Sequence, residues 1–126
     1  NYAWQNAEDK ELDEDAARAP EQQAYLRAHW TLAHNWSVTG EFKWIADRNR
    51  EPFDPRDAID DYTIANLNLE KQNLFEHLDV GLRVRNLFDE NASEPSPYEA
   101  VPAGSLMPDD FPLEERSLHL TARLRF

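Results

Sequence analysis

Apolar and polar residues alternate along five segments of the chain. The alternation runs through residues 24–32, 36–47, 65–70, 78–85 and 118–126, with a shorter stretch at 1–5. Successive side chains of a β-strand point to opposite faces of a sheet, so this pattern predicts strands that each have one apolar and one polar face. We therefore expect an all-β protein built from about six strands.

The connections between these strands alternate in length. Short links lie near 33–35 and 73–76, and long, polar links lie at 8–21, 48–61 and 89–113. Successive links of an antiparallel up-and-down meander fall at opposite ends of the sheet, so we expect the short turns at one end and the long loops at the other. That sorting is typical of outer-membrane β-barrels, which have periplasmic turns and extracellular loops.

The residues of the apolar face carry no charge in a chain that is 30% charged. Lipid would require this, and so would a soluble core. Trp36 and Trp44 lie eight residues apart on this face. At about 3.3 Å per residue and a barrel tilt of about 35–45°, they are separated by roughly 19–21 Å across a membrane. We interpret Trp30, Trp36 and Phe126 as a turn-side aromatic girdle and Trp44 as its loop-side counterpart; the alternative is a set of core aromatics in a soluble β domain.

Composition excludes several other classes of protein. The formal net charge is −12, with 25 acidic and 13 basic residues, which argues against nucleic-acid binding. No cysteine is present, so a disulfide framework and a thiolate metal site are both excluded. No apolar run approaches the ~20 residues of a membrane helix. The alternation already begins at Asn1, so we expect the chain to be part of a larger protein.

Four segments of the chain are similar to one known family. They are Tyr2–Asp9, Asp60–Leu69, Gly81–Asp89 with its Asn86-Leu87-Phe88-Asp89, and the closing Ala122–Phe126. Together they resemble the C-terminal part of TonB-dependent outer-membrane receptors, and the resemblance covers nearly the whole chain. It implies that residues 1–126 supply about the last six strands of a transmembrane barrel of roughly 22, without the plug domain and the earlier strands.

The resemblance also implies a function in the bacterial outer membrane. Such receptors take up a scarce ligand, such as siderophore-bound iron or cobalamin, with energy that TonB delivers to the plug. Phe126 and Leu124 would then form the signal that the barrel assembly machinery reads, and the Pro-rich loop 89–113 would contact the small-molecule ligand. The alternatives are a passive outer-membrane barrel or porin, and a soluble β-sandwich binding module.

The polar face offers the remaining candidate sites. Five basic side chains are expected to face the barrel lumen: Arg83, Arg85, His119, Arg123 and Arg125. We interpret them first as partners of acidic residues on the wall or the plug, and second as a track for anions. Acidic clusters at 9–15 and 54–61 could bind Ca²⁺, but their spacing matches no known calcium loop, and a solvated loop is the preferred interpretation. No catalytic motif is found, so the sequence predicts neither an enzyme nor a cofactor or metal site.

Overall fold

The computed structural model describes residues 2–4, 8–9, 14–15, 20–51, 54–98 and 109–125, and side chains from residue 20 onward. Its main strands are β1 (Tyr2–Trp4), β4 (Pro20–Leu32), β5 (Trp36–Arg48), β6 (Tyr62–Leu74), β7 (Leu78–Arg85) and β10 (Ser117–Leu124). Four two-residue strands lie in the long connections: β2 (Glu8–Asp9), β3 (Glu14–Asp15), β8 (Ser93–Glu94) and β9 (Phe111–Pro112).

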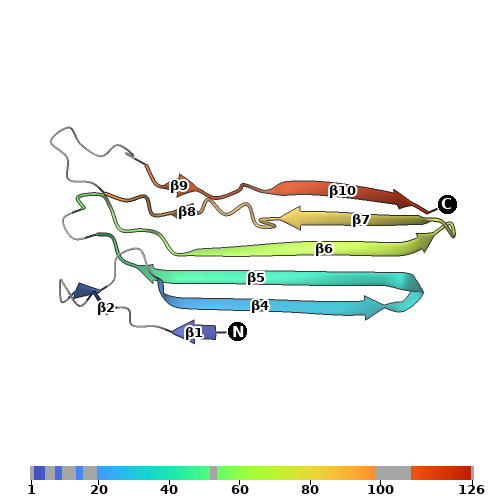
Figure 1. The fold of residues 1–126 in the computed structure, drawn as a ribbon, viewed down its shortest axis with the longest axis horizontal. Coiled ribbons are helices and arrows are strands. Elements are labelled where there is room, and N and C mark those ends of the chain that lie inside the picture. The colour runs from blue at the N-terminus through green and yellow to red at the C-terminus, as the bar shows by residue number, and fades with distance from the viewer. Residues whose placement is uncertain are drawn as a thin grey trace. The chain divides into compact units, whose positions relative to one another are not determined.

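The six main strands form one sheet in the order β1-β4-β5-β6-β7-β10 (Figure 1). The pairs β1/β4, β6/β7 and β7/β10 are antiparallel. Each main strand therefore lies beside the next main strand of the chain, as in an up-and-down meander. The predicted all-β class and the predicted strands are confirmed. Two small ladders, β2/β3 and β8/β9, were not predicted, since two-residue strands leave no periodic pattern.

The pairing register keeps the apolar residues together on one face. Leu82 of β7 pairs with Leu69 on one side and with Leu120 on the other, and Val84 pairs with Leu67 and Leu118 in the same way. Because side chains alternate between faces, the apolar positions of these three strands lie opposite one another, with the exception of Val80, which lies opposite Lys71 on β6. The predicted division of the sheet into two faces is thereby confirmed for β6, β7 and β10.

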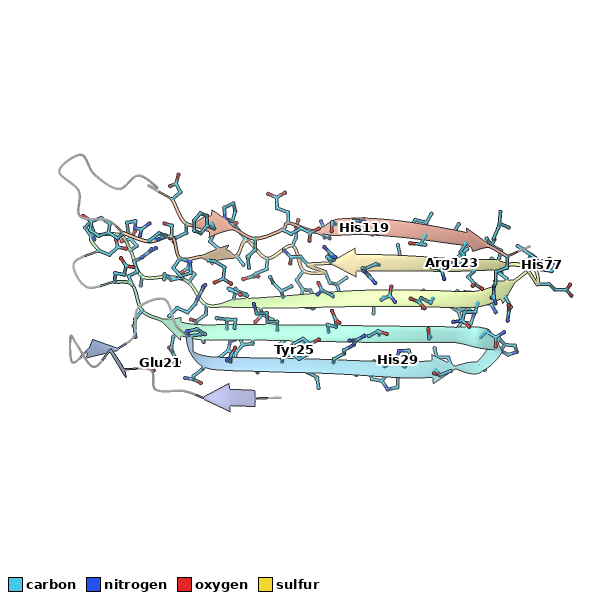
Figure 2. The ribbon with its side chains drawn as sticks, viewed as in Figure 1. Glu21, Tyr25, His29, His77, His119 and Arg123 are labelled. Carbon is cyan, nitrogen blue, oxygen red and sulfur yellow. The ribbon has the colours of Figure 1, made fainter. Side chains whose placement is uncertain are left out.

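Side-chain contacts extend the same division to β4 and β5. On the polar face, His29 Nδ1 lies 2.9 Å from the Thr39 hydroxyl, and Arg27 lies 3.6 Å from a carboxylate oxygen of Glu41. On the apolar face, the open space over Gly40 is bounded by the Trp30 ring. Figure 2 shows Tyr25 and His29 on β4 and His119 and Arg123 on β10, all at polar-face positions.

The short links are tight turns that require left-handed backbone. A 3₁₀ turn, η1 (Ala33–Asn35), joins β4 to β5, with φ of 60° at His34 and 59° at Asn35. The turn between β6 and β7 has φ of 52° at Phe75 and 69° at Glu76. Asn tolerates this conformation better than most residues, whereas it is uncommon for residues such as Phe and Glu.

The chain divides into two compact units. Unit 1 comprises Asn1–Ala24, Trp44–Thr63 and Asn91–Leu113, and unit 2 comprises Tyr25–Lys43, Ile64–Glu90 and Glu114–Phe126. Both short turns belong to unit 2, and most of each long connection belongs to unit 1. None of the helical residues that the structure describes forms a helix long and apolar enough to cross a membrane.

Candidate functional site

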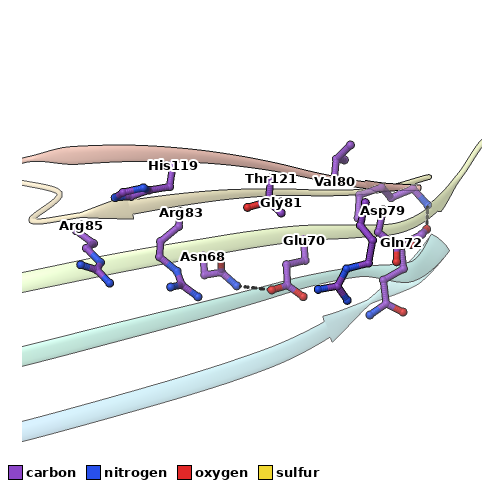
Figure 3. Close-up of a pocket in the computed structure, with 12 residues that line it drawn as sticks. Asn68, Glu70, Gln72, Asp79, Val80, Gly81, Arg83, Arg85, His119 and Thr121 are labelled. Atoms are coloured by element: carbon purple, nitrogen blue, oxygen red, sulfur yellow. Dashed lines mark hydrogen bonds between the residues drawn. The ribbon is translucent and has the colours of Figure 1, made fainter. Parts of the chain in front are cut away.

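A hollow of about 440 Å³ lies on the polar face of unit 2. Strands β6, β7 and β10 contribute its lining (Figure 3). We call it the polar hollow, and define it by Asn68, Glu70, Gly81, Arg83, Thr121 and Arg123, together with the neighbouring Arg85, Asp79 and His119. Its size falls within the range of about 300–1,000 Å³ that is usual for small-molecule sites.

The register arranges these side chains in rows across the three strands. Arg83 pairs with Asn68 on β6 and with His119 on β10. In the next row on this face, Gly81 lies between Glu70 and Thr121. Gly81 has no side chain, so the middle of this row is open and the backbone of β7 forms the floor of the hollow.

Most charged groups around the hollow already have a partner. Each partner neutralises a charge or satisfies a carboxylate, so these groups are less available to a ligand. The pairs are Arg85 with Glu114 at 2.9 Å, Arg125 with Asp79, and the Asn68 amide with Glu70 at 2.8 Å. Hydrogen bonds from the Ser117 hydroxyl and from Arg85 lower the pKa of Glu114 below its ordinary value, so Glu114 is held as the anion.

Two arginines of the hollow differ from the rest. Arg83 and Arg123 are exposed and make neither a hydrogen bond nor a salt bridge with any side chain in the described part of the chain. His119 lies beside them, with its Nε2 3.3 Å from the Ser117 hydroxyl. The hollow therefore presents two guanidinium groups without a hydrogen-bonded partner, of which Arg123 also lies opposite the Asp79 carboxylate, and an anionic group is the ligand that such donors bind best.

Four of the five predicted basic residues meet at this hollow: Arg83, Arg85, His119 and Arg123. The fifth, Arg125, lies instead at the turn end of β7, where it donates to Asp79 and, at 2.8 Å, to the Asn73 side chain. Gly81 was not predicted as part of a site. Its signal was present in the sequence, because a glycine inside a strand often marks a close approach of a ligand or another backbone.

The structure gives the Asn86–Asp89 motif a structural role. Asn86 is only 2% exposed and has φ of 47°. Its side-chain oxygen accepts from the Glu90 N–H at 2.9 Å, and its amide donates to the carbonyls of Glu90 and Glu114 at 2.8 and 3.1 Å. The Leu87 N–H donates to Ala65 O at 2.8 Å, and the Asp89 carboxylate accepts from the backbone N–H of Arg116 at 3.1 Å. Thus Asn86 and Asp89 both bond to the segment that leads into β10, while Phe88 is exposed.

A second cluster of charged groups organises unit 1. Arg50 donates to both carboxylate oxygens of Asp110, at 3.0 and 2.6 Å, and the Ser96 N–H donates to the same carboxylate at 3.1 Å. Arg56 lies 3.5 Å from Asp110 and donates to Asp54 at 2.6 Å. These bonds lower the pKa of Asp110 to about 2, with the hydrogen bond from Arg50 as the largest cause. Residues from three separated parts of the chain are thus tied together, a contact that was not predicted.

Arg48, the last residue of β5, is the most enclosed arginine of unit 1. Its side chain is 1% exposed and lies over the Tyr62 ring at 4.8 Å. One terminal nitrogen donates to Ser93 O at 2.8 Å and approaches Glu94 at 3.4 Å, and the other donates to Asp60 O. The Arg48 guanidinium therefore satisfies carbonyl groups of two long connections at once.

The remaining predicted residues differ in exposure. Trp30 and Trp36 of unit 2 are 54% and 37% exposed, Trp44 of unit 1 is half-buried, and Leu124 is 63% exposed. Phe126 lies outside the described residues. The girdle and the assembly signal remain predictions.

The acidic loop 54–61 makes protein contacts. Asp54 is bound by Arg56, which lowers its pKa, and the Asp61 carboxylate accepts from the Asp47 N–H at 3.0 Å. Within the described ranges, no group of three acidic or histidine side chains is placed to hold a metal ion. The acidic side chains of 9–15 lie outside those ranges.

Comparison of the chain with protein-family models, curated proteins and solved structures gave no match.

Proposed function

We propose that the chain is part of the wall of an outer-membrane β-barrel, with the apolar face of its strands against lipid. The observation that carries this proposal is the exposure of that face in unit 2. Its large side chains have no protein cover: Leu26 is 62% exposed, Trp30 54%, Leu118 67%, Leu120 82% and Leu124 63%. Burying one such side chain in an apolar medium stabilises a protein by about 1.5–3 kcal/mol, so a face of this extent requires an apolar neighbour.

Strand length supports the same placement. Strands β4, β5 and β6 have 13 residues each, more than the roughly 9–11 that a tilted strand needs to cross the hydrocarbon layer. Strands β7 and β10 have eight residues each, about one short of that range. The long connections, which contain most of the acidic residues, would lie in water at one surface of the membrane.

Within this class, we propose a TonB-dependent receptor that actively takes up a scarce ligand such as siderophore-bound iron or cobalamin. The resemblance of Asn86–Asp89 and of the last strand supports this choice. In this proposal the chain supplies wall and loops, the plug that contacts TonB belongs to the rest of the protein, and the polar face lines the lumen. The barrel assembly machinery would insert the protein.

A matched pair of variants on β10 tests the lipid contact. Leu120→Arg places a charge on the apolar face, and Thr121→Arg places the same charge on the polar face one residue away. For the intact protein folding into lipid vesicles, we expect Leu120→Arg to cost about 2–4 kcal/mol, the usual cost of Arg near the bilayer midplane. Thr121→Arg should cost less than about 1 kcal/mol. Equal effects, or a protein that folds as a compact monomer without lipid or detergent, would favour a soluble β-sandwich.

A swelling assay separates the receptor from a passive pore. Liposomes that contain the intact protein are placed in an isotonic solution of arabinose. A barrel closed by a plug should admit the sugar no faster than empty liposomes do. Rapid swelling would instead identify an open channel and overturn the receptor assignment, while leaving the membrane placement intact.

A further inference from the structure

We propose that the polar hollow of unit 2 binds a small organic molecule that carries two anionic groups, carboxylates or phosphates. Arg83 and Arg123 bind one group each, and the open floor over Gly81 holds the body of the molecule. This site lies on the face opposite the lipid-facing one, and the inference goes beyond the proposed function because it requires neither a membrane nor TonB.

The first argument is the state of the charges. In a chain of net charge −12, neighbouring acids neutralise Arg85 and Arg125, yet Arg83 and Arg123 have no bonded partner among the described residues. An arginine that served only as a solvated surface group would have no need to lie in the same hollow as a second unpaired arginine. Two of them beside one concavity supply the forked donors that bind carboxylate and phosphate.

The second argument is the floor. A Cβ on Gly81 would lie 3.7 Å from Glu70 Cγ, 3.8 Å from Leu69 O and 3.9 Å from Thr121 Cβ, which are ordinary contact distances. The structure therefore has room for a larger residue here, and the backbone of Gly81 does not require glycine, since φ there is not positive. A glycine costs a strand stability. Its effect here is to keep the hollow open between the rows of Arg83 and Arg123.

The spacing selects a ligand with two charged ends. Arg123 is four residues further along β10 than His119, the residue that pairs with Arg83. At about 3.4 Å per residue the two arginine backbones are therefore roughly 14 Å apart, and their side chains can approach from both ends. The Thr121 hydroxyl lies between them as a neutral donor. Glu70 on β6 would repel an anion, whereas Arg125 neutralises Asp79, the carboxylate opposite Arg123 on β7. The ligand is therefore confined to the side formed by β7 and β10 (Figure 3).

Calorimetric titration of the intact, detergent-solubilised protein at low salt tests the site, with citrate and pyrophosphate as probes. We expect both to bind at one site per chain, and sulfate, which has a single anionic centre, to bind at least about tenfold more weakly. The double variant Arg83→Gln/Arg123→Gln should weaken binding by at least about tenfold. Gly81→Val keeps every charge but fills the floor, and should weaken binding by a similar factor.

Arg116→Gln is the matched control, because Arg116 is a half-exposed arginine of the same unit that pairs with Asp89 at 3.2 Å, away from the hollow. The Arg116→Gln variant should bind citrate with the same affinity as the unchanged protein. Absence of binding by the unchanged protein would overturn the proposal. That result is expected if acidic side chains from elsewhere in the protein already fill the hollow. Binding that survives both the double variant and Gly81→Val would also overturn it. Neither result affects the lipid contact, which the Leu120 and Thr121 variants measure separately.

Discussion

Among the described residues, arginine side chains are largely buried in unit 1 and exposed in unit 2. Arg48 and Arg50 of unit 1 are 1% and 13% exposed, whereas Arg85, Arg116 and Arg125 of unit 2 are 47–50% exposed. The difference follows from what the backbone needs. Strands satisfy their own carbonyl groups through the ladder, but the long connections of unit 1 do not, so arginine side chains bind their carbonyls instead. In unit 2 most of the arginines bind side-chain carboxylates at the exposed surface of the sheet instead.

Apolar side chains show the opposite distribution. Ile45, Ile59 and Tyr62 of unit 1 are 5%, 9% and 3% exposed, while Leu120 of unit 2 is 82% exposed. Unit 1 therefore has a small core of its own, and because Ile45 and Ala46 are neighbours on β5 that point to opposite faces, both faces of that strand are covered there. Unit 2 has a two-faced sheet whose apolar side remains uncovered. The comparison teaches that the long connections of this chain enclose apolar side chains, whereas its regular strands leave apolar side chains exposed.

The most severe test of this comparison is Arg48→Met, which keeps the volume of a buried arginine but removes its donors. The carbonyls of Asp60 and Ser93 would lose their partner, and Glu94 would lose an ion pair. Because each unsatisfied buried group costs about 1–3 kcal/mol, we expect unit 1 to lose about 3 kcal/mol. Hydrogen exchange of the backbone amides of residues 60–63 and 92–94 in the intact protein measures this loss.

Arg27→Met is the control for that experiment, because Arg27 of unit 2 is 62% exposed and its pair with Glu41 is 3.6 Å long. Exposed pairs contribute only about 0–1 kcal/mol, so its removal should hardly change exchange. If both variants had the same small effect, burial of arginine would not be what holds the loops of unit 1.

A second, smaller effect is expected at Asn86, the one buried polar side chain among the described residues of unit 2. Asn86→Ala removes three side-chain hydrogen bonds and places alanine at φ of 47°. We expect a loss of about 2–3 kcal/mol in the free energy of unfolding, measured by urea titration of the intact protein. Asn86→Gly loses the same bonds but tolerates the backbone, so it should be about 1 kcal/mol less destabilised. Identical losses in the two variants would show that the backbone conformation contributes nothing.

The strands and the two faces could be predicted from the sequence because both are periodic. The shared polar face of Arg83, His119 and Arg123 followed from the same alternation once β7 and β10 were expected to be neighbours. The sequence could not show that Arg85 has a partner while Arg83 does not, since that depends on Glu114, which lies just before β10. The resemblance drew attention to Asn86, but its burial and its bonds to Glu90 and Glu114 could only come from the structure.

The loop contacts of unit 1 could not be predicted for a different reason. Arg50 and Asp110 are sixty residues apart, and each belongs to a polar segment that has many other charged residues. An ion pair leaves no periodic pattern, and any of several acids could have served as the partner. Loop residues were therefore expected to be solvated, whereas Asp54 is almost fully buried against Arg50 and Arg56.

The smallest expected effect concerns Asp110, and its dependence on pH identifies it. The pKa of Asp110 in the folded protein is lowered to about 2 from the ordinary 3.8. Its contribution is therefore fully present above about pH 4, where the carboxyl group is ionised even in the unfolded chain. That contribution is lost as pH falls from about 4 to about 2. A pKa change of this size corresponds to about 2–3 kcal/mol before screening, and partial exposure of the pair to solvent reduces the expected contribution to about 1–2 kcal/mol.

Asp110→Asn should accordingly be less stable than the unchanged protein by about 1–2 kcal/mol at pH 5, and the difference should shrink toward zero at pH 2. Urea titrations of the intact protein at four or five pH values between 2 and 5 measure this difference. Asp109→Asn, which changes an exposed neighbour, should show no such trend. A difference that stayed constant over this range would mean that Asp110 acts through packing alone. In that case the buried ion pairs of unit 1 would contribute no more to stability than the exposed pairs of unit 2 do.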